Sequence, residues 1–378
     1  MINYLHDKKQ EMIDLLEAIV NTDSNSYDKE GVDQVGALLK EKFEDIGMYV
    51  KIHRQTEQGN HLEIKAKRES QPKILIIAHM DTVFPKGEAK KRPFSVIGDK
   101  AYGPGVNDEK ASHVQVLYAM KALKKSGSPA VNNVHIIFNS DEEIGSISSK
   151  SLIDEAAVGK DYSLVVECGR PNDGVVTERK GVGHFTVNVT GKGAHSGVEP
   201  EIGLSAIEEL AYKVIKLQQL NDYKQGLTVN VGLIKGGTSV NTVPPHAEAE
   251  IDVRVKNEDQ AMNVTNSIHQ IAGEEIVKGT RTELTGAIDR PPMERTEESE
   301  KLFNTVKETG KELGFTIHEV STGGGSDAAF TAAKGIPTID GIGPIGEFSH
   351  SETEEYTDLN SLVDRTILLA KIIERLSM

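Results

Sequence analysis

Three short apolar runs, separated by helical patterns, constrain the fold of this chain more than any other feature. The runs are KILIIAH at 73–79, VHIIFN at 134–139 and YSLVVE at 162–167, and each has the composition of a strand that is buried on both faces. Between the first two runs, apolar residues recur at helical spacing, at Val114, Leu117, Met120 and Leu123. Because strands alternate with helices, we expect an α/β sheet with helices on its faces.

The pattern changes near residue 180. Polar and apolar residues alternate in the run HFTVNVTG, as they do in a strand with one solvated face. Further segments of this part are two strands at 228–234 and 247–255 and two helices near 204–218 and 258–273. Such a combination is typical of a small α+β domain with an open sheet.

The order of these segments predicts two domains. We expect an α/β domain made of residues 1–179 and 288–378, interrupted by an inserted α+β domain at 180–287. An exposed strand edge in so small an insert is a candidate surface for pairing with another chain.

Charge and cysteine content narrow the class of protein. The chain has 378 residues and a formal charge of −15, which disfavours nucleic acid and anionic lipid as partners but not divalent cations. Its one cysteine, Cys168, cannot build a disulfide framework, so we expect a reducing compartment. The polar N-terminus lacks the apolar core of a signal peptide, and no later run is long enough to span a bilayer. These features predict a cytoplasmic protein without a membrane segment.

Acidic residues and a histidine gather where the expected strands end. The four clusters are His79-Met80-Asp81, Asp108 within GPGVNDEK, the run Ser140–Glu143, and Glu167. Ligands of open α/β sheets bind outside the carboxyl ends of the strands, and adjacent carboxylates repel one another unless a cation lies between them. Taken singly, each cluster has an ordinary alternative: a surface pair, a helix cap, a solvated turn, or a strand that ends in water.

Taken together and in order, the motifs resemble a known family. HMDTV, GPGVNDEK, DEEIGS, a strand that ends in glutamate, GAHSG, GGTSVNTVP, DVR, GGGSDA and a late HS are similar to the di-zinc metallopeptidases. That family includes glutamate carboxypeptidases, aminoacylases, succinyl-diaminopimelate desuccinylases and bacterial tripeptidases; the chain looks most like the first and the last. The resemblance implies a catalytic domain with helices on both faces of a mixed sheet, interrupted by an inserted α+β dimerisation, or lid, domain.

The resemblance also implies a metal-ligand set. His79 and Glu167 match ligands of one zinc ion, Glu143 and His350 match ligands of a second, and Asp108 matches the carboxylate that bridges both. Cobalt or manganese are possible substitutes for zinc. The late His350 alone would be interpreted as a solvated loop residue.

Catalytic roles follow from the same match. Asp81 resembles the carboxylate that orients His79, and Glu142 resembles the general base that takes a proton from a water held between the two metals. The resemblance further implies a cis peptide bond between Asp108 and Glu109.

Substrate contacts are expected mainly from the insert. His195 in GAHSG matches a histidine that reaches the active site from the partner subunit of a homodimer, and Asn241 and Arg254 match positions that hold the substrate. Each has an alternative: a solvated loop histidine, a turn residue, and a strand residue paired with a nearby acid. Gly324 and Gly325 could offer amide groups to a substrate anion, or could form a simple turn capped by Ser326 or Asp327.

Three functions remain open at this point. A two-zinc exopeptidase that acts on small peptides and an N-acyl amino acid deacylase would use the same site. A catalytically silent relative that binds a small amino-acid ligand is the third possibility, but the intact Glu142 and the complete ligand set favour an enzyme.

Overall fold

The computed structural model describes all of residues 1–378, and the chain divides into two compact units. Unit 1 comprises Met1–Glu178, Arg295–Thr322 and Ser326–Met378. Unit 2 comprises Arg179–Glu294 and Gly323–Gly325.

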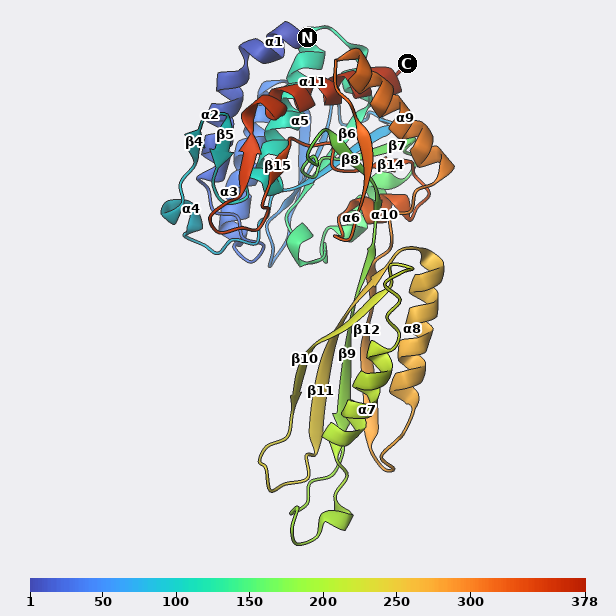
Figure 1. The fold of residues 1–378 in the computed structure, drawn as a ribbon. Coiled ribbons are helices and arrows are strands. Elements are labelled where there is room, and N and C mark those ends of the chain that lie inside the picture. Colours follow the sequence, from blue (N-terminus) through green and yellow to red (C-terminus); the bar gives the residue numbers. More distant parts are fainter. The chain divides into compact units, whose positions relative to one another are not determined.

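A six-stranded mixed sheet forms the centre of unit 1 (Figure 1). Its strands, in spatial order, are β1 (Tyr49–His53), β2 (His61–Lys65), β6 (Val134–Asn139), β3 (Ile74–His79), β7 (Tyr162–Val165) and β14 (Thr338–Ile339). The last four strands are parallel to one another, whereas β1 and β2 join antiparallel. The three apolar runs of the sequence are β3, β6 and β7, which confirms those strands to within two residues.

Helices surround this sheet (Figure 1). They are α1 (Ile2–Asp7), α2 (Lys9–Val20), α3 (Lys29–Asp45), α4 (Glu88–Lys91), α5 (Ala111–Lys125), α6 (Lys150–Ala157), α9 (Glu297–Glu312), α10 (Ala328–Ala332) and α11 (Leu359–Leu376). Every residue of β3 and β6 is buried, so both faces of the sheet are covered, and the predicted α/β class with a mixed sheet is confirmed. No helix combines the length and the apolar composition needed to cross a bilayer.

Two smaller sheets complete unit 1. One has the order β15 (Gly346–Glu347), β16 (Tyr356–Asp358), β5 (Lys100–Tyr102) and β4 (Ser95–Ile97). The other pairs β8 (Gly174–Arg179) with β13 (His318–Thr322). The first of them brings the segment around His350 back to the loop that precedes α5, because β16 pairs with β5.

Unit 2 has a different architecture: an antiparallel sheet covered on one face (Figure 1). The strand order is β10 (Thr228–Gly236), β11 (His246–Val255), β9 (Gly181–Thr190) and β12 (Arg281–Arg290), and the helices are α7 (Ala206–Gln218) and α8 (Glu258–Gly273). Along β11, buried residues alternate with partly exposed ones. The buried set packs with apolar residues of α7 and α8, so the alternation found in the sequence reflects one covered face.

A buried lysine joins the two helices of unit 2. The ammonium group of Lys213 on α7 lies 2.9 Å from the Glu209 carboxylate, and both side chains are fully buried. The same ammonium donates to the carbonyl oxygens of Ile271 and Ala272, at 3.0 Å each, near the end of α8. Lys213 thereby satisfies the carbonyl groups that a helix end leaves without partners.

Candidate metal centre and substrate site

The carboxyl edge of the parallel strands carries the predicted metal residues. His79 is the last residue of β3, and Glu167 follows β7 by two residues. Glu142 and Glu143 begin a short 3₁₀ turn, Glu142–Ile144, that follows β6. Because these strands are parallel, their carboxyl ends meet at one edge of the sheet, as expected for a ligand site of this fold class.

Asp108 reaches this edge through a tight loop before α5. Gly105 has a φ of +70°, and a Cβ atom there would lie 2.4 Å from Thr82 Cγ2, so the position requires glycine. The peptide bond between Asp108 and Glu109 is cis, as the resemblance implied.

A buried glutamate holds this loop in place. The carboxylate of Glu355 accepts hydrogen bonds from the backbone N–H groups of Gly105, Asn107 and Asp108, at 3.1, 3.0 and 3.1 Å. Three bonds to one carboxylate fix the backbone that presents the Asp108 side chain.

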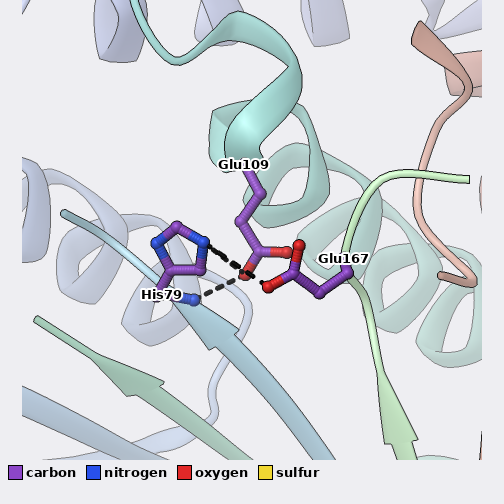
Figure 2. A group of neighbouring side chains, drawn as sticks. All are labelled: His79, Glu109 and Glu167. Carbon is purple, nitrogen blue, oxygen red and sulfur yellow. Dashed lines mark hydrogen bonds and ion pairs between the residues drawn. The ribbon is translucent and has the colours of Figure 1, made fainter. Parts of the chain in front are cut away.

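One group of possible metal ligands consists of His79, Glu109 and Glu167 (Figure 2). All three are buried, and one ligand atom from each lies within 4.8 Å of the others. The Nε2 atom of His79 is 3.7 Å from a Glu167 oxygen and 3.9 Å from a Glu109 oxygen. Figure 2 shows both carboxyl groups directed toward the imidazole.

A second group shares His79 and adds Asp108 and Glu143, again within 4.8 Å. His79 Nε2 is 3.1 Å from one oxygen of Asp108, and His350 Nε2 is 3.4 Å from the other. His350 also lies 3.3 Å from a Glu143 oxygen. The five residues that the sequence predicted as metal ligands therefore lie together, with Asp108 between the two histidines.

Asp81 contacts both His79 and the 3₁₀ turn Glu142–Ile144. The Nδ1 atom of His79 is 3.0 Å from the Asp81 carbonyl oxygen and 3.5 Å from its carboxylate. The Asp81 carboxylate accepts from the backbone N–H groups of Glu142 and Glu143, at 3.2 Å each, and from the Ser26 hydroxyl at 2.6 Å. Asp81 thus fixes the orientation of the His79 ring and the positions of Glu142 and Glu143.

The electrostatics of this cluster favour bound positive charge. Burial raises the pKa of Glu143 to about 7 and raises the pKa of Glu109 well above its ordinary value. Hydrogen bonds to Asp108 and Glu143 raise the pKa of His350 to about 11. These shifts share one cause: carboxylates are crowded in a buried place, so protons or a divalent cation stabilise them.

The donor set fits zinc. Imidazole nitrogens and carboxylate oxygens are its usual ligands, and the buried Oε2 atom of Glu109 has no hydrogen-bond partner. The orientation of His79 by a carboxylate behind it is the usual arrangement for a ligating histidine.

Glu109 is the one possible ligand of this cluster that was not predicted from the sequence. It is 1% exposed, and its carboxylate accepts the backbone N–H of His79 at 2.6 Å. The only signal in the sequence is its place beside Asp108, where a second acidic residue is expected to be solvated.

Two predicted substrate residues lie side by side in unit 2. The backbone segments of His195 and Asn241 are adjacent, since the N–H of Ser196 donates to the Asn241 carbonyl oxygen at 3.0 Å. Both side chains are exposed. The Nδ1 atom of His195 accepts the backbone N–H of Gly197 at 3.1 Å, so the neutral ring carries its proton on Nε2.

Arg254 lies elsewhere in unit 2. It is the ninth residue of β11, whereas Asn241 precedes the first residue of that strand. At about 3.3 Å per strand residue, His246 at the start of β11 and Arg254 near its end are about 26 Å apart. The Arg254 guanidinium donates to the Asp252 carboxylate at 2.9 and 2.8 Å, which is the pairing that the alternative interpretation describes.

The glycine run before α10 is held through its carbonyl groups. Nη1 of the buried Arg179 donates to the carbonyl oxygens of Gly324 and Gly325, at 3.1 and 3.2 Å. Ser326 Oγ accepts the N–H of Ala328 at 3.2 Å, where α10 begins. The turn capped by Ser326, which was the alternative interpretation, is therefore present. The binding of a substrate anion by the glycine amide groups stays a prediction.

Comparison with known proteins agrees with this geometry. The model of peptidase family M20/M25/M40 matches residues 75–375. Carboxypeptidase G2 of Pseudomonas sp. (strain RS-16) is 32% identical over 371 residues, 97% of this chain and 89% of that relative. Acetylornithine deacetylase of Vibrio campbellii (strain ATCC BAA-1116) is 28% identical over 262 residues, 64% of this chain and 67% of that relative.

A solved structure extends the comparison to the fold. The crystal structure of a tripeptidase from Staphylococcus aureus subsp. aureus mu50 has a TM-score of 0.80 and 24% identity, and the match covers 98% of each chain. The family match spans most of the sequence, and the residues at the sheet edge are of the kind that bind metal ions. The chain therefore belongs to peptidase family M20/M25/M40, a family of metal-dependent hydrolases.

Proposed function

We propose that this enzyme is a two-zinc exopeptidase that removes the carboxy-terminal residue of a small peptide. The observation that supports this most is the convergence of His79, Asp108, Glu143, Glu167 and His350 from five separate parts of the chain. The relative that aligns with 97% of the chain is a carboxypeptidase, which favours cleavage at the carboxy terminus.

In the proposed reaction, the metal ions and the protein side chains have different roles. Two zinc ions bound by these residues would polarise the scissile carbonyl group and acidify a water molecule. Glu142 acts as general base: its carboxylate takes the proton of the attacking water and then gives it to the leaving amine. Asp81 keeps Glu142 in position through the backbone N–H that it accepts.

The residues of unit 2 bind the substrate. His195 donates a hydrogen bond to the carbonyl oxygen as negative charge develops on it, while Asn241 and Arg254 hold the rest of the substrate. About 26 Å of β11 separates Arg254 from His246, and the His195–Asn241 pair lies beyond His246, so the two groups are too far apart to contact one small peptide. We therefore propose a homodimer through unit 2, in which one chain supplies His195 and Asn241 to the site of the other.

The remaining features are consistent with an intracellular enzyme. Cys168 is buried and free, as expected in a reducing compartment, and we propose a cytoplasmic location.

A substrate screen tests the proposal. Zinc-loaded protein should be assayed for amino acid release from N-blocked dipeptides, free dipeptides and tripeptides, and N-acyl amino acids. We expect release of the carboxy-terminal residue from N-blocked dipeptides, with the Glu142→Gln protein inactive and an exposed control, Glu308→Gln, fully active.

The other outcomes are equally specific. Hydrolysis of N-acyl amino acids alone would establish the deacylase alternative, for which the similarity to acetylornithine deacetylase is the supporting observation. Zinc binding with no hydrolysis of any substrate would contradict the proposal and support a silent amino-acid-binding relative.

A further inference from the structure

A cavity in unit 1 gathers basic side chains far from the proposed metal centre. Its volume is about 440 Å³, within the roughly 300–1,000 Å³ typical of small-molecule sites. We call it the lysine pocket, after its basic lining residues Lys51, Lys65, Lys73, Lys160, His53 and His135.

The lysine pocket lies at the amino ends of the parallel strands. His135 is the second residue of β6, Lys73 directly precedes β3, and Lys160 lies two residues before β7. The metal-binding candidates lie at the opposite ends of the same strands, and a six-residue strand is about 17–20 Å long. The two sites are therefore separated by the length of the sheet.

Strand register places the pocket's groups on one face of the sheet. Lys51 of β1 lies opposite Glu63 of β2, and Lys65 of β2 lies opposite His135 of β6. Residues two apart on a strand point to the same face, so His53 joins them.

Glu63 is surrounded by two lysines and two histidines. Its Oε2 atom lies 2.8 Å from His53 and 3.5 Å from Lys51, and its Oε1 atom lies 2.8 Å from Lys65 and 3.2 Å from His135. Glu63 thus orders the lining but has no acceptor capacity left for a further cation.

The charge balance of the lining is positive. Four lysines and two carboxylates, Glu63 and Glu155, line the pocket, and Asp161 beside the lining compensates Lys73. This leaves an excess of one positive charge on a protein of net charge −15. Lys160 forms no ion pair, and Lys73 pairs outside the pocket with Asp161, at 3.6 Å. Burial lowers the pKa of Lys160, and the neighbouring Lys65 and Lys73 lower it further. A bound anion would relieve this repulsion.

His135 forms a buried part of the pocket wall. Its side chain is 5% exposed and lines the pocket, and its Nδ1 atom has no hydrogen-bond partner. Because both of its ring nitrogens are buried, His135 shapes the wall of the pocket, and the lysines supply the donors to a ligand.

We propose that the lysine pocket binds a dianionic phosphate group, either as inorganic phosphate or as the phosphate ester of a small metabolite. A phosphate group supplies the negative charge that Lys160 lacks in the lining. A tetrahedral phosphate offers acceptors in several directions, which suits lysine ammonium groups from different segments. Binding joins β2 and β6 to the segments that enter β3 and β7, so it stabilises unit 1 from the side opposite the metal centre. This inference is independent of the proposed function.

Phosphate titration of the full-length, zinc-loaded protein tests the proposal. The melting temperature and the heat of binding should be followed with sodium phosphate at pH 8, against sodium chloride of equal ionic strength. We expect a saturable rise in melting temperature with phosphate only. Lys65→Gln combined with Lys160→Gln should weaken phosphate binding at least ten-fold. The matched control, Lys301→Gln combined with Lys311→Gln on the exposed face of α9, should bind as the wild type does.

A second variant protects the test against misfolding. Lys73 is half exposed, so Lys73→Gln should leave the fold intact and still weaken phosphate binding several-fold. A wild-type protein with no saturable response would overturn the proposal. Equal phosphate affinity in the wild type and in the folded pocket variants would also overturn it, because the anion would then bind at the metal centre or elsewhere.

Discussion

Among single residues, the neighbours Glu142 and Glu143 illustrate how position divides two identical side chains. Both backbone N–H groups are held by Asp81, but only Glu143 lies within 4.8 Å of His79 and Asp108 as a possible ligand. The same substitution at each position therefore distinguishes the proposed general base, Glu142, from the proposed metal ligand, Glu143.

We predict that the two variants lose activity for different reasons. Glu142→Gln should lower the catalytic rate by about 10²–10⁴-fold, the usual contribution of a general base, while the zinc content stays near that of the wild type. Glu143→Gln should lose zinc as well as activity. Zinc content from mass spectrometry and steady-state rates check both, and an active Glu142→Gln protein would remove this residue as the base.

A second single-residue prediction concerns Glu355. In Glu355→Gln, an amide N–H₂ group replaces one of the oxygens that accept the N–H groups of Gly105, Asn107 and Asp108. An unsatisfied buried group costs about 1–3 kcal/mol, so the free energy of unfolding in urea should fall by that amount. Zinc affinity should also fall, since Asp108 is less firmly presented.

The matched control is the exposed Glu352→Gln three residues earlier. A Glu355→Gln protein as stable as this control would show that the carboxylate does not hold the Asp108 loop.

Among elements, α7 and α8 show how a buried charge can join two helices. Lys213 is paired with Glu209 and donates to carbonyl groups near the end of α8. Replacing it with methionine leaves Glu209 buried without its cation, and breaking such a pair costs about 3–5 kcal/mol. Hydrogen–deuterium exchange of α7 and α8 peptides in the full chain should accelerate, while exchange in β3 and β6 should not change. Lys224→Met, an exposed lysine of unit 2, is the control.

The same pair predicts a pH dependence. Although burial alone raises it, the N–H groups of Val277 and Ile276 and the Lys213 ammonium lower the pKa of Glu209 below its ordinary value. A carboxylate with a lowered pKa stabilises the fold fully above its unfolded pKa of about 4.3, and this contribution is lost as the pH falls through the folded pKa.

Exchange of α7 in the wild type should therefore accelerate as the pH is lowered from about 4 toward 3, after correction for intrinsic exchange rates. In Glu209→Gln this acceleration should be smaller. An equal acceleration in both proteins would show that another group titrates there.

At the scale of the whole molecule, the distribution of substrate residues over unit 2 calls for a second chain. Arg254 lies near one end of β11, and the His195–Asn241 pair lies beyond the other end. A complementation experiment follows from this arrangement.

We predict that mixing Glu142→Gln protein with His195→Ala protein restores activity, although each is nearly inactive alone. With random exchange of subunits, half of the dimers are mixed and each mixed dimer has one intact site, so recovery should approach about a quarter of wild-type activity. Native mass spectrometry, which separates the mixed dimer from both homodimers by mass, confirms the exchange. Mixed dimers without activity would show that His195 acts within its own chain.

The local sequence pattern by itself determined much of the secondary structure and indicated part of the candidate site. The three strands that carry the site were predictable to within two residues, because a buried parallel strand must be continuously apolar. His79, Glu143 and Glu167 stood out by their position after those strands, and Asp108 by its position before a helix. Their assignment as ligands, and that of His350, came from the resemblance of the ordered motifs to a known family. The α+β character of the segment after residue 180 followed from a change in the period of apolar residues.

Other features were decided only by tertiary packing. Glu109 and Glu355 look like solvated acids in the sequence, but packing against distant segments buries both and makes one a possible ligand and the other a clamp. The lysine pocket and the distance between Arg254 and His195 depend on strand register and length between residues far apart in the chain. Burial and long-range distance are properties of the packed chain, whereas periodicity is a property of neighbouring residues, and only the latter is written directly in the sequence.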